Sequence, residues 1–199
     1  MDGLKEICSI GAGNAATALS QMVDKRINMG IPSIKFIPLS KVSSVFGSSE
    51  SLIVGIYCNI LGDVSGEILL TFSRESAFAI CEILLDKKPG KIKILGDLER
   101  SALQETGSII SSSFVNAFAS IMKKSLLISV PKFAYDMAGS IIDFILIELS
   151  ETYNKAVVLE IKFSDTSSRI KGEFFIIPNP SSLKLLISAV GSSFPEENK

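Results

Sequence analysis

The stretch "SIGAGNAATAL", from Ser9 to Leu19, decides how the fold of this chain is interpreted. Its residues Gly11 to Ala16 fit the G-x-G-x-x-A pattern that binds dinucleotide pyrophosphates, a pattern that predicts a turn between a strand and a helix. The apolar residues from Asp2 to Asp24 instead recur at roughly helical spacing. The choice is therefore between a nucleotide-binding turn and a helix whose glycines allow close packing.

A repeat within the chain favours the helix. Three residues of the first half recur 99 positions later: Glu6, Ser9 and Pro32 correspond to Glu105, Ser108 and Pro131. The second copy, "ETGSIISSSFVNAF" (Glu105–Phe118), lacks the two glycines and carries a helical apolar face. No Asp or Glu occurs from Lys25 to Lys41, where an NAD ribose would need one. Dinucleotide binding stays as an alternative that a cofactor titration would detect.

The repeat and the turn residues predict an α+β fold of two pseudo-symmetric halves. We expect a single domain with repeats at 1–90 and 91–191 and a mobile tail at 192–199. About six antiparallel strands should form one sheet, with two long helices on one face. The predicted helices are Asp2–Asp24, Ser73 to about Leu85, Asp97 to about Lys124, and Ser181 to Val190, with Ser73 and Asp97 as caps. The predicted strands are Ser33–Pro38, Ser51–Asn59, Val64–Phe72, Asp143–Glu148, Lys155–Phe163 and Ile170–Pro178.

The composition excludes several classes of function. The net charge of −1 among 199 residues argues against a nucleic-acid partner. No apolar run reaches the roughly 20 residues of a membrane span, and no signal peptide is recognisable, so we expect a soluble cytoplasmic protein without membrane insertion. Cys8, Cys58 and Cys81 are expected to be small core residues in a reducing compartment. The chain has no histidine, which removes histidine-based acid–base and nucleophile chemistry.

Each predicted long helix carries a polar triplet at spacing i, i+4, i+7, which places the three side chains on one face. A proline follows 23 positions after the last residue of each triplet. The first set is Asp2, Glu6, Ser9 and Pro32, and the second is Ser101, Glu105, Ser108 and Pro131.

These triplets resemble the signature of the CheC family of chemotaxis phosphatases, [DS]-x3-E-x2-N-x22-P, which occurs twice in CheC. The segments "LKEICSIGAGNAATALSQM" (Leu4–Met22), "VSGEILL" (Val64–Leu70) and "IPNP" (Ile177–Pro180) carry the resemblance further. It implies a protein that binds phosphorylated CheY, with the aspartyl phosphate and Mg²⁺ both supplied by CheY. This chain would then need no cofactor or metal of its own.

The resemblance also implies roles for the motif residues. Glu6 and Glu105 match the glutamate that pairs with a lysine of CheY. The family asparagine, whose amide orients the attacking water, is replaced here by Ser9 and Ser108. A serine hydroxyl is about one bond shorter and offers fewer hydrogen-bonding groups than an amide.

Two functions stay open on this basis. The first is a phosphatase for phosphorylated CheY, weakened by the two serines. The second is a non-catalytic module that docks phosphorylated CheY, regulates the receptor deamidase CheD, or does both. Whether the chain is an enzyme is therefore undecided by its sequence.

Overall fold

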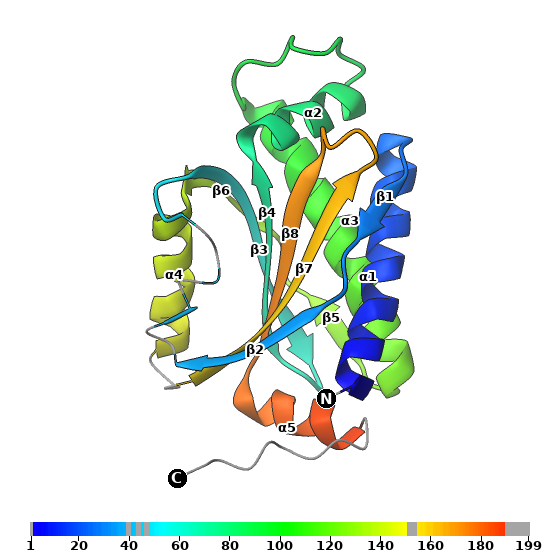
Figure 1. The fold of residues 1–199 in the computed structure, drawn as a ribbon, viewed down its shortest axis with the longest axis vertical. Coiled ribbons are helices and arrows are strands. Elements are labelled where there is room, and N and C mark those ends of the chain that lie inside the picture. Colours follow the sequence, from blue (N-terminus) through cyan, green and yellow to red (C-terminus); the bar gives the residue numbers. More distant parts are fainter. Residues whose placement is uncertain (1, 39–40, 43–44, 46–47, 151–154, 190–199) are drawn as a thin grey trace.

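An antiparallel sheet of eight strands forms the centre of the computed structural model, which describes residues 2–38, 41–42, 45, 48–150 and 155–189 (Figure 1). The strands are β1 (Ile27–Met29), β2 (Ser33–Pro38), β3 (Leu52–Gly62), β4 (Gly66–Ser73), β5 (Leu126–Ile128), β6 (Lys132–Met137), β7 (Lys155–Asp165) and β8 (Lys171–Pro178). This confirms the α+β class and the antiparallel sheet. The predicted tail at 192–199 lies outside the described residues.

The sheet is six positions wide although it contains eight strands. Its order is β1-β7-β8-β4-β3-β5, with β2 also paired to β7 and β6 also paired to β3. Each edge position is therefore shared by two short strands in succession. Pro32 and Pro131 lie in these two interruptions, and proline cannot donate a ladder hydrogen bond. The prediction of about six strands differs from the structure because it omitted the short strands β1, β5 and β6 and counted one segment that is helical.

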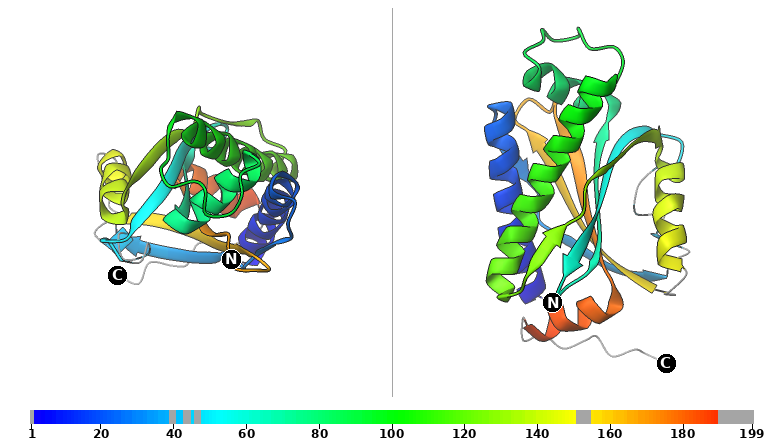
Figure 2. Two further views of the ribbon diagram at one scale, coloured as in Figure 1. Left: turned by 90° about the horizontal axis from the view of Figure 1, so that it is seen from above. Right: turned by 180° about the vertical axis from the view of Figure 1, so that it is seen from behind.

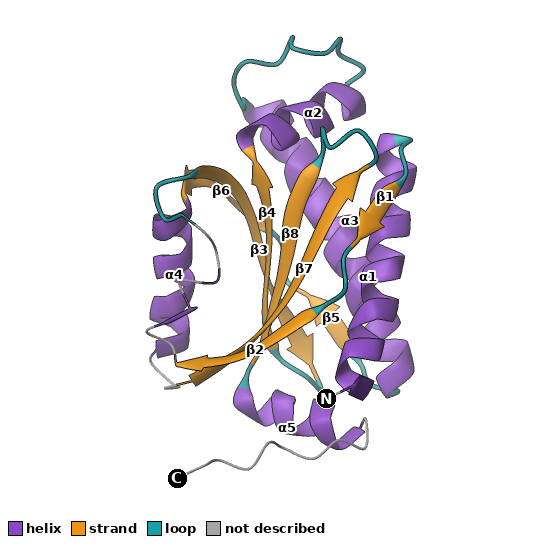
Figure 3. Cartoon of the chain, viewed as in Figure 1, coloured by secondary structure: helices purple, strands orange, loops and turns teal. Residues whose placement is uncertain are grey.

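Helices cover both faces of the sheet (Figure 2, Figure 3). The two long helices, α1 (Asp2–Val23) and α3 (Asp97–Met122), pack against each other on one face, as predicted. Helix α4 (Ala138–Ser150) covers the opposite face. Helices α2 (Arg74–Leu84) and α5 (Pro180–Ala189) lie near opposite ends of the sheet. None of the helices within the described ranges has the length and apolar character that a membrane crossing requires.

Two local predictions were wrong. The predicted strand Asp143–Glu148 lies inside α4, whose buried Ala138, Ile141, Ile142 and Ile145 follow helical i, i+3, i+4, i+7 spacing. The prediction followed the β-branched composition of this run and overlooked its period. The second error concerns α3, which is capped by Gly96 and not by Asp97. The Glu99 carboxylate accepts a hydrogen bond from the Gly96 N–H at 3.0 Å.

The glycines of the opening stretch lie inside α1, so no strand-to-helix turn exists there. A Cβ placed on Gly11 would lie 2.7 Å from Cε2 of Phe114, which is a severe overlap. A Cβ on Gly13 would have no neighbour within 4 Å. Gly11 therefore permits α1 to approach α3 closely, whereas Gly13 faces open space. This geometry excludes a Rossmann-type pyrophosphate-binding turn at Gly11–Ala16.

Strand pairing follows the same register in both halves of the chain. Ile27 of β1 pairs with Asp165 at the end of β7, and Leu126 of β5 pairs with Gly62 at the end of β3. At the centre of the sheet β4 pairs with β8. The partner of each edge strand therefore comes from the other half, so neither half holds its sheet edge by itself.

All three cysteines are buried, as predicted, and burial raises the pKa of Cys8 and of Cys81 to about 12 and that of Cys58 to about 11. The thiolate is the reactive form, so at pH 8 the folded protein should react only slowly with a thiol reagent such as dithiobisnitrobenzoate. Three equivalents should react at once in denaturant. Rapid labelling of the native protein would show that a cysteine is accessible.

Candidate functional site

The second polar triplet lies on the outer face of α3 and lines one shallow pocket. Ser101, Glu105, Ser108 and Pro131 all contribute to this pocket, which has a volume of about 480 Å³. Gln104, Ile128, Ser129 and Val130 complete the described lining. The spacing in the sequence therefore brings together the four residues of the second motif, and we call this surface the α3 pocket.

Two polar contacts fix the segment that carries Pro131. The Gln104 side chain donates from Nε2 to the Pro131 carbonyl oxygen at 3.0 Å. The Ser129 N–H donates to the Asn59 carbonyl oxygen at 2.9 Å, and the Asn59 N–H donates to Ser129 Oγ at 2.9 Å. One side of the pocket is thus attached both to the helix and to the sheet.

The first triplet lies near the start of α1 and differs in detail. Glu6 and Ser9 are exposed, and Pro32 is buried. The Ser9 hydroxyl donates to the Lys5 carbonyl oxygen at 2.8 Å, one helical turn earlier. Ser108, by contrast, has no hydrogen-bond partner for its hydroxyl within the described ranges, and it is half-buried. The side chain of Asp2 lies outside what the structure describes.

Both motif glutamates are available to a partner. Glu6 and Glu105 are exposed, and neither has an ion-pair partner in the part of the chain that the structure describes. Glu105 is the one charged residue among the described residues of the α3 pocket. A carboxylate in this setting can accept a charge-assisted hydrogen bond from a lysine of another protein. Groups of three or more metal-ligating side chains are absent among the described residues.

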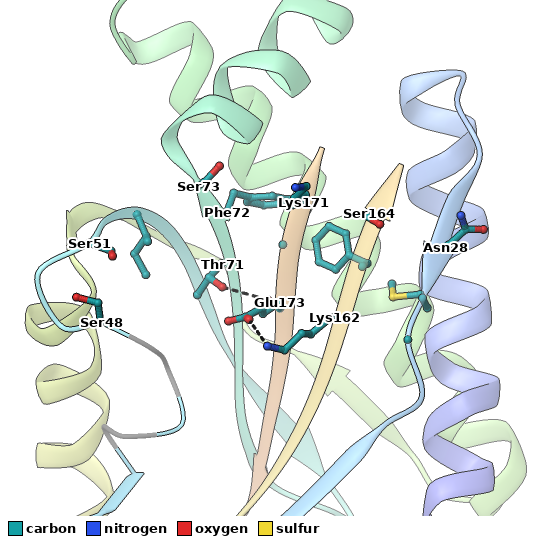
Figure 4. Close-up of a pocket in the computed structure, with 15 residues that line it drawn as sticks. Asn28, Ser48, Ser51, Thr71, Phe72, Ser73, Lys162, Ser164, Lys171 and Glu173 are labelled. Atoms are coloured by element: carbon teal, nitrogen blue, oxygen red, sulfur yellow. Dashed lines mark hydrogen bonds and ion pairs between the residues drawn. The ribbon is translucent and has the colours of Figure 1, made fainter. Parts of the chain in front are cut away.

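A larger pocket, of about 750 Å³, lies elsewhere and contains none of these motif residues (Figure 4). Its charged groups are largely paired within the protein. Lys162 contacts Glu173 at 3.1 Å and Glu160 at 3.4 Å, and the attraction of Glu173 and then Glu160 raises the pKa of Lys162. Because Glu160 is buried and also contacts Lys35, its charge is compensated within the sheet, and these ion pairs account for the charges of Lys162 and Glu173 without a ligand. We therefore place the candidate functional site at the motif residues and not at this larger pocket.

The sequence interpretation missed four residues that line the site: Gln104, Ile128, Ser129 and Val130. The contacts of Gln104 and Ser129 join segments that are far apart in the sequence, and no local pattern indicates them. Val130 could have been found, because Ile31 occupies the position 99 residues earlier and also precedes a proline.

The fold and the site define a class: an α+β domain whose two long helices each expose a glutamate, with a serine three residues later. Among known proteins, the chain is 30% identical over 197 residues to the CheY-P phosphatase CheC of Bacillus subtilis, which covers 97% of this chain and 94% of that protein. The chain therefore belongs to the CheC family. No family model matches it.

Solved structures show the same fold. The crystal structure of Thermotoga maritima FliY matches with a TM-score of 0.73 and 17% identity, over 96% of this chain and 94% of that one. A chain of the CheX–CheY–BeF3–Mg²⁺ complex from Borrelia burgdorferi matches with a TM-score of 0.55 and 19% identity, over 87% of this chain and 96% of that one.

Proposed function

We propose that this chain is a chemotaxis protein that docks phosphorylated CheY through Glu6 and Glu105. The observation that carries the proposal is the α3 pocket, where the exposed Glu105 lies beside Ser101, Ser108 and Pro131. Two comparisons support CheY as the partner. The chain is similar to CheC over nearly its whole length, and a CheX–CheY complex is known in this fold.

The chemistry at this surface would be catalysis by positioning. CheY would bring the aspartyl phosphate and the Mg²⁺, and the glutamate would pair with a lysine of the CheY site. The residue three positions later would then lie close to the phosphate, where the family asparagine orients water. Ser9 and Ser108 occupy those positions, so we propose that hydrolysis is weak.

A second candidate function follows from the same two serines. A protein that keeps both docking glutamates but lacks both amides is suited to hold phosphorylated CheY or to regulate CheD. Binding without accelerated hydrolysis would favour this module over the phosphatase. Both functions would be exercised in the cytoplasm.

We also propose that the domain consists of two repeats, 1–90 and 91–191. The matching registers of β1 with β7 and of β5 with β3 support a duplication. Each repeat would supply one docking site, on α1 and on α3.

Neutralising the glutamates should test the docking role. Because a charge-assisted pair contributes about 1.5–3 kcal/mol, Glu105→Gln should weaken binding at its site roughly 10- to 100-fold. Glu6→Gln should weaken binding at the first site to the same extent, and the double variant should bind little CheY. Isothermal titration with beryllofluoride-activated CheY measures this directly.

The matched control is Asp143→Asn, which removes an exposed carboxylate from α4 on the opposite face of the sheet. It should bind as the unmodified protein does. Equal binding by the double glutamate variant and this control would contradict the proposed function.

A further inference from the structure

Two apolar side chains project into solvent immediately before the two motif prolines. Ile31 is 87% exposed and Val130 is 85% exposed. An exposed apolar residue is ordinary by itself. These two, however, occupy equivalent positions in the two halves, next to Pro32 and Pro131. The 99-residue correspondence therefore relates Ile31 to the first motif as Val130 is related to the second.

The backbone that presents Val130 is held on both sides. Ser129 exchanges two hydrogen bonds of 2.9 Å with Asn59, and the Pro131 carbonyl accepts from Gln104 at 3.0 Å. The residue before Ile31 is also fixed, because the Gly30 N–H donates to the Lys162 carbonyl oxygen at 2.7 Å. When hydrogen bonds already hold the backbone in this way, a partner can cover the side chain without the entropic cost of ordering that backbone.

Val130 lines the α3 pocket together with Glu105 and Ser108. Any protein that reaches the Glu105 carboxylate must therefore come close to the Val130 side chain. An apolar side chain that a partner buries next to a charged contact adds the free energy of apolar burial to the electrostatic attraction.

We propose that Val130, and Ile31 at the first site, are apolar anchors that the receiver domain of phosphorylated CheY covers when it docks. This inference rests on the proposed function, because it names further contacts of the same two sites. The carboxylate would direct the partner to the site, and the β-branched side chain would add the apolar contact that slows its release.

Replacement by serine removes the apolar contact and keeps a small side chain. In titrations with beryllofluoride-activated CheY, Val130→Ser should weaken binding at the α3 pocket roughly 5- to 30-fold, as expected for loss of a buried Val contact. Ile31→Ser should do the same at the first site, and Val130→Ile should keep the affinity. Thermal unfolding should be unchanged, because both side chains are exposed in the free protein.

The matched control is Ile94→Ser, which removes a 76% exposed side chain outside the α3 pocket. It should leave CheY binding unchanged. If the unmodified protein binds and Glu105→Gln weakens binding, but Val130→Ser binds like Ile94→Ser, the anchor inference alone is overturned. If the unmodified protein does not bind CheY at all, the proposed function is wrong and the anchor inference with it.

A second copy of this chain is the competing occupant of the same surface. Sedimentation of the unmodified protein and of Val130→Ser distinguishes the two occupants. A monomer in both cases agrees with the proposal. An oligomer that Val130→Ser dissociates, without a change in CheY affinity, would assign Val130 to self-association and overturn it.

Discussion

Replacing Ser108 by asparagine should raise the rate at which this protein dephosphorylates CheY on the order of 100-fold. An asparagine amide reaches about one bond further than the serine hydroxyl and offers a carbonyl together with two N–H donors. A displacement of about 1 Å in a water-positioning group can alone cost that factor. Asparagine and serine have similar helix propensities, so α3 should tolerate the change. Loss of phosphate from CheY in the presence of each variant is the measurement.

The same replacement at Ser9 should also accelerate hydrolysis, but by less. The Ser9 hydroxyl already donates to the Lys5 carbonyl, and Asn14 on the same helix donates from Nδ2 to the Ile10 carbonyl at 3.0 Å. An asparagine at position 9 can satisfy its amide in the same way, which would turn it away from a partner. The double variant should be roughly additive, since the two sites lie on different helices.

Ser120→Asn is the control, because it makes the same change at an exposed position of α3 outside the pocket. It should leave the rate unchanged. Two results would contradict the positioning mechanism. One is hydrolysis by the unmodified protein as fast as by the asparagine variants, which would show that serine suffices. The other is a variant that binds phosphorylated CheY with full affinity and gains no activity.

Elements with local signals were predicted well from the sequence. The predicted Ser33–Pro38 strand coincides with β2, and the predicted first helix is one residue longer than α1. Ser73 caps α2 as expected, since its hydroxyl accepts from the Ser76 N–H at 3.2 Å. Caps, prolines and regular apolar spacing act within a few residues, so the sequence displays them directly.

Elements that depend on distant partners were missed. Strands β1 and β5 have three residues each and exist only through pairing with β7 and β3, more than 60 residues away. Helix α4 was misassigned for another reason: the prediction followed the β-branched composition of 143–148 and overlooked the helical spacing of the apolar residues around it. The glutamate and serine positions came from the family signature, whereas Gln104 and Ser129 required the fold.

The two glycines of α1 provide the last test, because their environments are opposite. Gly13→Ala should stabilise the protein by about 0.5–1 kcal/mol, since alanine is the better helix former and its Cβ would meet nothing within 4 Å. Gly11→Ala has the same gain in propensity, but its Cβ would overlap the Phe114 ring at 2.7 Å. Phe114 cannot withdraw easily, because it is buried with ring centroids of Phe118 and Phe174 at 5.9 and 5.1 Å.

Overpacking of this kind costs about 1–3 kcal/mol, so Gly11→Ala should be destabilising despite the favourable propensity. Urea unfolding should show opposite shifts for the two variants, and their melting temperatures should separate by several degrees. Replacing the Phe114 ring by the smaller leucine side chain should relieve the overlap. In the Phe114→Leu background, Gly11→Ala should therefore lower the free energy of unfolding much less. If both alanines stabilise equally, α1 and α3 are not in close contact at Gly11. In that case the glycine has a different purpose, and the explanation of the G-x-G-x-x-A stretch as a helix-packing feature would be wrong.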